Sequence, residues 1–128
     1  MNRANIVDSS GWLEYLADSR NAAFFGPAIE DTENLLVPVI TIYEVFKKVL
    51  RERGENEALQ VAGMMQGGQA IEVDSALALD AARYPLPLAD SLIYATARMH
   101  DATLWTLDEH FKDLPGVRYL AKKTQAAK

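Results

Sequence analysis

The stretch LPLADSLIYATARMHDATLWTLDEHF, residues 86–111, contains a helix, a strand and two acidic residues in a fixed order. Apolar residues at helical spacing predict a helix that follows Pro87, and a polar break separates this helix from the strand ATLWTL. Asp90 lies in the first turn of the predicted helix, and Asp108 follows the strand. A charged carboxylate is rarely buried unless it is paired or binds a metal. Each of these acids therefore needs a partner.

The predicted helix has one apolar face. Helical spacing places on that face Leu88, Leu92, Ala95 and Met99. Asp90 is expected to lie off this face, so the helix can pack against a core while the carboxylate stays accessible.

The N-terminal segment repeats the order of strand, acid and helix. The apolar run ANIV predicts a buried strand that ends at Val7. Asp8, Ser9 and Ser10 follow it, and such residues cap the helix that begins here. A carboxylate is therefore expected at the C-terminal end of the first strand.

A third acid follows the second apolar run. This run begins at Leu35 and is interrupted by Pro38, and a helix is predicted from about Thr41. Glu44 is then expected in the first turn of that helix.

The remaining chain continues the alternation. AIEV predicts a third strand, Asp74 and Ser75 can cap the helix after it, and VRYL predicts a final strand. Alternating strands and helices predict a three-layer α/β/α fold with a central, largely parallel sheet. We expect a single domain over residues 1–128, with a polar tail from about residue 121 that is a candidate for disorder.

Composition excludes several classes of function. There are no cysteines, which excludes disulfides, thiolate catalysis and cysteine-ligated metals. The net charge of −5 disfavours broad nonspecific binding to nucleic acid. No apolar run approaches the ~20 residues that a membrane span needs, and the first residues lack the apolar core of a signal peptide. We expect a cytoplasmic protein with no membrane partner.

Four acids, Asp8, Glu44, Asp90 and Asp108, could meet at one edge of the predicted sheet. Carboxylates crowded together raise one another's pKa unless a cation neutralises them. Oxygen ligands without cysteine suit Mg²⁺ or Mn²⁺, which favour the hydrolysis of phosphodiesters. Taken singly, each acid also has a structural interpretation, such as a helix cap or an ion pair within a helix.

The motifs around these acids resemble the PIN domain family, and within it the VapC-type toxins. The resemblance rests on DSS after the first strand, TIYEVFK around Glu44, LPLADSLI around Asp90, and LWTLDEHF with Thr106 and Asp108. It covers nearly the whole chain, in the family's order and spacing.

The resemblance implies a Mg²⁺- or Mn²⁺-dependent endoribonuclease that hydrolyses RNA phosphodiester bonds, as the toxin of a toxin–antitoxin pair. It implies catalytic and metal-binding roles for four acids, Asp8, Glu44, Asp90 and Asp108, with Ser9 and Thr106 as polar support. It also implies three partners: an RNA substrate, a cognate antitoxin protein and a second copy in a homodimer. Asp74 matches no acid of the family and is expected to be only a cap.

Two other functions fit a small α/β protein with acids at its strand ends. The first is a phosphoacceptor receiver-like signalling domain, although Asp8 lacks an adjacent acid and VRYLAKK lacks the usual Lys-Pro step. The second is a catalytically inactive PIN-like interaction module, although all four acids are present.

Overall fold

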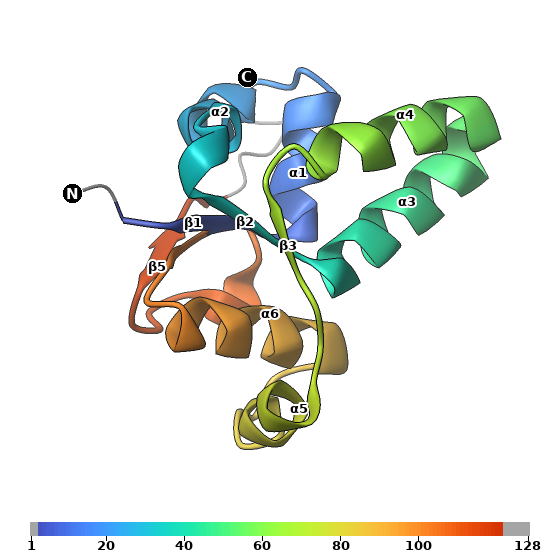
Figure 1. Ribbon diagram of the computed structural model, residues 1–128. Coiled ribbons are helices and arrows are strands. Elements are labelled where there is room, and N and C mark those ends of the chain that lie inside the picture. The colour runs from blue at the N-terminus through green and yellow to red at the C-terminus, as the bar shows by residue number, and fades with distance from the viewer. Residues whose placement is uncertain (1–2, 122–128) are drawn as a thin grey trace.

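The computed structural model describes residues 3–121 (Figure 1). The polar tail expected from about residue 121 therefore lies outside the described residues, apart from Ala121. No helix in the described range is both long and apolar enough to cross a membrane.

A parallel sheet of five short strands forms the centre of the fold. The strands are β1 (Asn5–Val7), β2 (Leu35–Pro38), β3 (Gln69–Ile71), β4 (Thr103–Thr106) and β5 (Val117–Tyr119). Their order in the sheet is β3-β2-β1-β4-β5, and every pairing among them is parallel. The predicted central sheet is confirmed.

Helices cover both faces of this sheet. Successive strand residues point to opposite sides, and apolar residues of the strands need covering on each side. Val7 packs with Trp12 of α1 (Ser9–Leu16) and Phe25 of α2 (Ala22–Glu30). Ile6, next to Val7, packs instead with Ile93 of α6 (Leu88–Met99). Figure 1 shows α1 and α2 on one side of the sheet, and α5 (Ser75–Ala81) and α6 on the other. The predicted α/β/α architecture is confirmed, although the sequence patterns did not predict α2.

The remaining elements connect these layers. They are η1 (Thr32–Asn34), α3 (Val39–Arg53), α4 (Glu55–Met65), α5 (Ser75–Ala81) and η2 (Glu109–Phe111). Helices α3 and α4 form a hairpin that extends away from the sheet in Figure 1. Gly54 joins them with a φ of 95°, a conformation that suits glycine because it has no Cβ.

The start of α3 differs from the prediction. The helix begins at Val39 rather than about Thr41, so Glu44 lies in its second turn and not in its first. Pro38 is the last residue of β2 and the N-cap of α3 rather than an interruption. A proline ring fixes φ near the helical value and removes an N–H that a helix start leaves unbonded, which explains this position.

The predicted core face of α6 is only partly right: Ala95 is buried and Leu92 packs beside it, next to Leu77 and Ala81 of α5. Leu88 and Met99 are 78% and 52% exposed, whereas Ile93, Tyr94 and Ala97 are buried against the sheet. Helical spacing puts Asp90 on this same buried side, not off it. The sheet decides which side of the helix is covered, and the apolar residues of α6 occur on more than one side.

Candidate functional site

Strand order brings the ends of β1 and β4 together. The chain adds β2 and β3 on one side of β1, and then returns to add β4 and β5 on the other side. In parallel sheets, ligands bind beyond the carboxyl ends of the strands at such a reversal of order. Asp8 follows β1 at this point, and Asp108 lies two residues after β4.

Asp8 is buried and forms three hydrogen bonds. It is the N-cap of α1, and its Oδ1 accepts bonds from the Gly11 N–H at 3.0 Å and from the Ser10 hydroxyl at 2.8 Å. Its Oδ2 accepts a bond from the Thr106 hydroxyl at 2.6 Å. Burial raises the pKa of Asp8 to about 6, although these hydrogen bonds act in the opposite direction and Asp108 adds to the rise. The predicted helix cap is therefore present, and its burial disfavours the charged form of the Asp8 carboxylate.

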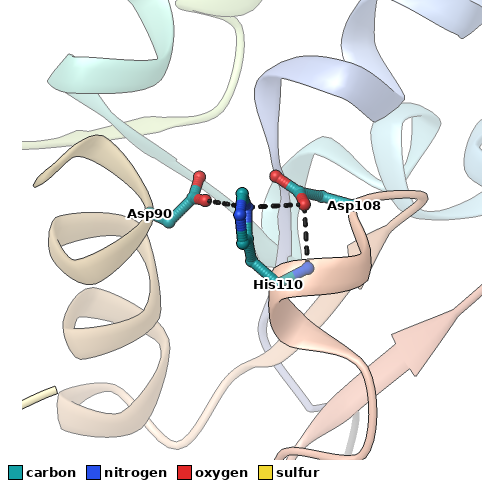
Figure 2. A group of neighbouring side chains, drawn as sticks. All are labelled: Asp90, Asp108 and His110. Atoms are coloured by element: carbon teal, nitrogen blue, oxygen red, sulfur yellow. Dashed lines mark hydrogen bonds and ion pairs between the residues drawn. The ribbon is translucent and has the colours of Figure 1, made fainter. Parts of the chain in front are cut away.

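Asp90 and Asp108 face each other across His110 (Figure 2). The His110 Nδ1 lies 2.9 Å from Asp90 Oδ2 and 2.9 Å from Asp108 Oδ1. One ligand atom from each residue lies within 4.8 Å of the others, so the three side chains form a group that could hold a metal ion. The tertiary fold alone brings Asp90 on α6 to Asp108 after β4.

The electrostatic environment of Asp90 links all four acids. Burial, together with the charges of Asp108, Asp8 and Glu44, raises the pKa of Asp90 to about 6, although His110 acts in the opposite direction. The carboxylate of Asp108, through its hydrogen bond and its charge, raises the pKa of His110. The structure therefore places the predicted acids close enough to repel one another.

Glu44 reaches the site from α3. Its Oε1 accepts a hydrogen bond from the Ser9 hydroxyl at 2.5 Å, which connects the first turn of α1 to α3. This contact differs from the alternative in which Glu44 pairs within its own helix. Glu44 and Asp8 do not belong to the tight group of Asp90, Asp108 and His110.

Thr106 connects Asp8 to the turn that carries Asp108. Its side chain is fully buried. Its hydroxyl donates to Asp8 Oδ2 and accepts from the Asp108 N–H at 2.8 Å. Thr106 and Ser9 thus each contact an acid, as the sequence analysis expected of them.

His110 is a site residue that the sequence analysis did not predict. It follows Asp108 by two residues, within the short helix η2 that Asp108 caps. An Asp-x-His sequence in a turn directly after a strand was the available signal, because the tight turn keeps both side chains on one side. The sequence could not show that Asp90 would lie on the other side of the imidazole.

Asp8 is buried, but Asp108 and His110 are accessible from outside. They line an open pocket of about 530 Å³, together with Leu107, Glu109, Tyr119 and Ala121. Carboxylate oxygens of like charge next to an open pocket suit a hard divalent cation and a phosphate-containing ligand.

Comparisons with known proteins identify the family of the chain. The sequence profile of the PIN domain matches residues 6–117. No curated protein matches the sequence directly.

Several solved structures share the fold. A toxin–antitoxin complex from Klebsiella pneumoniae aligns with a TM-score of 0.73 and 22% identity, over 90% of this chain and 96% of that one. DNA-bound VapBC from Salmonella typhimurium aligns with a TM-score of 0.70 and 15% identity, over 93% and 98% of the two chains. VapC20 of Mycobacterium tuberculosis, a toxin that cleaves the sarcin-ricin loop, aligns with a TM-score of 0.70 and 15% identity, over 89% of this chain and 97% of that one. Because the family profile covers most of the chain and the fold agrees, this chain belongs to the PIN domain family.

Proposed function

We propose that this protein is a metal-dependent endoribonuclease that hydrolyses RNA phosphodiester bonds with Mg²⁺ or Mn²⁺. The observation that carries the proposal is the convergence of Asp8, Glu44, Asp90 and Asp108 at one end of the sheet, where burial, with a contribution from mutual repulsion, raises the pKa of Asp8 and Asp90. Such a cluster is destabilising by itself and becomes favourable once a cation neutralises it. RNA as the substrate rests on the family.

The residues have distinct roles in this proposal. Asp90 and Asp108 hold the ion directly, because their oxygens already belong to one compact group. Asp8 and Glu44 contribute negative charge and further oxygens to the same site. The ion would supply an activated water nucleophile and would neutralise negative charge on the phosphate. Ser9 orients Glu44 through a hydrogen bond, and Thr106 donates one to Asp8.

We further propose that the nuclease is the toxin of a toxin–antitoxin pair, that a cognate antitoxin covers the acidic site, and that the toxin forms a homodimer. Similar folds occur in a toxin–antitoxin complex from Klebsiella pneumoniae and in VapBC from Salmonella typhimurium, which supports this biological role. The electronegative site would attract a cationic segment of the antitoxin.

A cleavage assay tests the nuclease. Purified protein is incubated with total RNA in Mg²⁺, Mn²⁺ or EDTA, and the cleavage ends are mapped. We expect metal-dependent cleavage that Asp90→Asn abolishes. Asp74→Asn is the matched control, because Asp74 is also a helix N-cap but belongs to α5, outside the acidic site. Equal cleavage by wild type and Asp90→Asn would contradict the proposed site.

A growth assay tests the toxin. Expression of the wild-type chain without an antitoxin should slow growth, Asp90→Asn should not, and a small protein encoded by a neighbouring gene should restore growth. A soluble protein that cleaves RNA but leaves growth unchanged would contradict the toxin role while leaving the nuclease intact.

The receiver-like alternative is disfavoured by topology. Flavodoxin-like receivers have the strand order 2-1-3-4-5, whereas here β1 lies between β2 and β4. Incubation with a small phosphodonor should therefore leave no phosphoryl group on Asp8. The inactive-module alternative predicts no cleavage by the wild-type protein in any metal.

A further inference from the structure

The imidazole of His110 lies between the two carboxylates that the proposed metal site uses (Figure 2). Its Nδ1 is 2.9 Å from an oxygen of each, Asp90 Oδ2 and Asp108 Oδ1. Asp90 comes from α6 and Asp108 from the loop after β4, so the histidine joins two separate elements. Neither the proposed function nor the family resemblance assigns a role to this residue.

The backbone around His110 fixes where the imidazole can lie. Asp108 caps η2 by accepting the His110 N–H at 2.9 Å. Phe111, the next residue, is fully buried in the core and anchors the turn from its other side. The imidazole is therefore held at the site by a short, anchored turn rather than by a long loop, although the side chain remains 56% exposed.

The distances suit three ligands of one ion. An octahedral ion with bonds of about 2.1 Å places neighbouring ligand atoms about 3.0 Å apart. The Nδ1 of His110 lies at nearly this distance from both carboxylate oxygens, and all three ligand atoms lie within 4.8 Å of one another.

We propose that His110 is a direct metal ligand through Nδ1, so that this protein has a mixed nitrogen and oxygen site with Asp90 and Asp108. The inference rests on the proposed metal site and goes beyond it, because it assigns a ligand and an ion preference. Imidazole nitrogen binds transition metals such as Mn²⁺ and Co²⁺ better than it binds Mg²⁺. The site should therefore prefer Mn²⁺ to Mg²⁺ more strongly than carboxylates alone would.

Pulsed electron paramagnetic resonance of bound Mn²⁺ tests the ligand without any enzyme assay. The metal-free full-length protein receives less than one equivalent of Mn²⁺, and electron spin echo envelope modulation is recorded. We expect ¹⁴N modulation from a directly bound histidine, which changes in protein labelled with ¹⁵N-histidine. The labelled sample assigns the nitrogen to a histidine even if a variant fails to fold, and of the two histidines only His110 lies in the acidic group.

The sequence provides a matched control, since its two histidines are His100 and His110. The Nδ1 of His100 lies 3.0 Å from the Thr96 carbonyl oxygen at the end of α6, outside the acidic group. The histidine modulation should vanish in His110→Gln and persist in His100→Gln. Circular dichroism checks that both variants fold.

Calorimetry with Mn²⁺ and Mg²⁺ gives the ion preference. We expect His110→Gln to weaken Mn²⁺ binding at least about tenfold, because even residues that only support a ligand contribute this much, and to weaken Mg²⁺ binding less. His100→Gln should bind both ions like the wild type.

The outcomes separate the two proposals. If Mn²⁺ binds and Asp90→Asn abolishes its binding, but no histidine nitrogen couples to the ion, His110 is a hydrogen-bonding neighbour that moves away and the present inference is overturned. If the wild-type protein binds neither Mn²⁺ nor Mg²⁺, the metal site of the proposed function is overturned as well.

Discussion

Replacing Asp8 by Asn removes a buried negative charge from the acidic site and nearly preserves its shape. The Asn Oδ1 can still accept the hydrogen bonds from Gly11 and Ser10, so the N-cap of α1 remains. The bond from Thr106 to Asp8 Oδ2 is lost or reversed. We expect this variant to lose RNA cleavage and to be more stable than the wild type in the absence of metal.

The magnitude follows from the pKa of Asp8. A carboxyl group whose pKa is higher in the folded state than in the unfolded state destabilises the folded protein. The full penalty applies at pH values above the pKa of the folded state. It fades as the pH falls towards the pKa of the unfolded state. A rise from 3.8 to about 6 corresponds to roughly 3 kcal/mol at pH 7.5. Loss of the hydrogen bond from Thr106 costs about 1 kcal/mol. The expected net stabilisation is about 1–2 kcal/mol.

Urea denaturation in EDTA at pH 7.5 and pH 4.5 measures the difference in stability between Asp8→Asn and the wild type. At pH 4.5 the folded Asp8 is mostly protonated and its penalty falls to about 1 kcal/mol, so the two proteins should become nearly equal in stability. At pH 7.5 the variant should melt about 4–8 °C higher in a thermal scan. Asp74→Asn, at another N-cap, should show no such stabilisation.

Two results would refute this reasoning. One is an Asp8→Asn variant that is no more stable than the wild type at pH 7.5, because burial would then not oppose the charge. The other is a stability difference that does not change between pH 7.5 and pH 4.5, because the effect would then not come from this carboxyl group.

Substitutions at three further positions probe other parts of the site and core. Asp90→Asn should abolish cleavage and the stabilisation by Mn²⁺ in a melting assay, because a neutral amide binds a hard cation poorly; a retained melting shift would argue against Asp90 as a ligand. Thr106→Val should lower the free energy of unfolding, measured by urea denaturation, by about 1–3 kcal/mol, because it leaves the Asp108 N–H unbonded. Thr106→Ser keeps the hydroxyl and should be as stable as the wild type. Gly11→Ala should lower the free energy of unfolding by about 1–3 kcal/mol, because the added Cβ would lie 2.6 Å from Val7 Cγ1 and 2.7 Å from Phe25 Cε1. An unchanged urea denaturation curve would show that α1 can shift to make room.

The sequence by itself determined most of the local elements, although not α2, and the chemistry available to them. Apolar runs identified the strands, and Asp8 and Asp74 were recognised as helix caps because capping depends on residues within one turn. The four separated acid motifs also indicated the family before any contact was known. These are properties of short segments, so a short segment suffices to predict them.

The tertiary structure decided which of these residues meet. Asp8 and Thr106 are 98 positions apart and meet because the chain returns to β1. Asp90 and His110 are 20 apart and meet because α6 packs against the turn after β4. Part of the buried face of α6 was mispredicted, because packing against the sheet and against α5 decides which apolar residues are covered. The raised pKa values of Asp8 and Asp90 likewise arise from burial and from charges on other elements. Contacts between distant segments depend on strand order, and no local pattern in the sequence encodes that order.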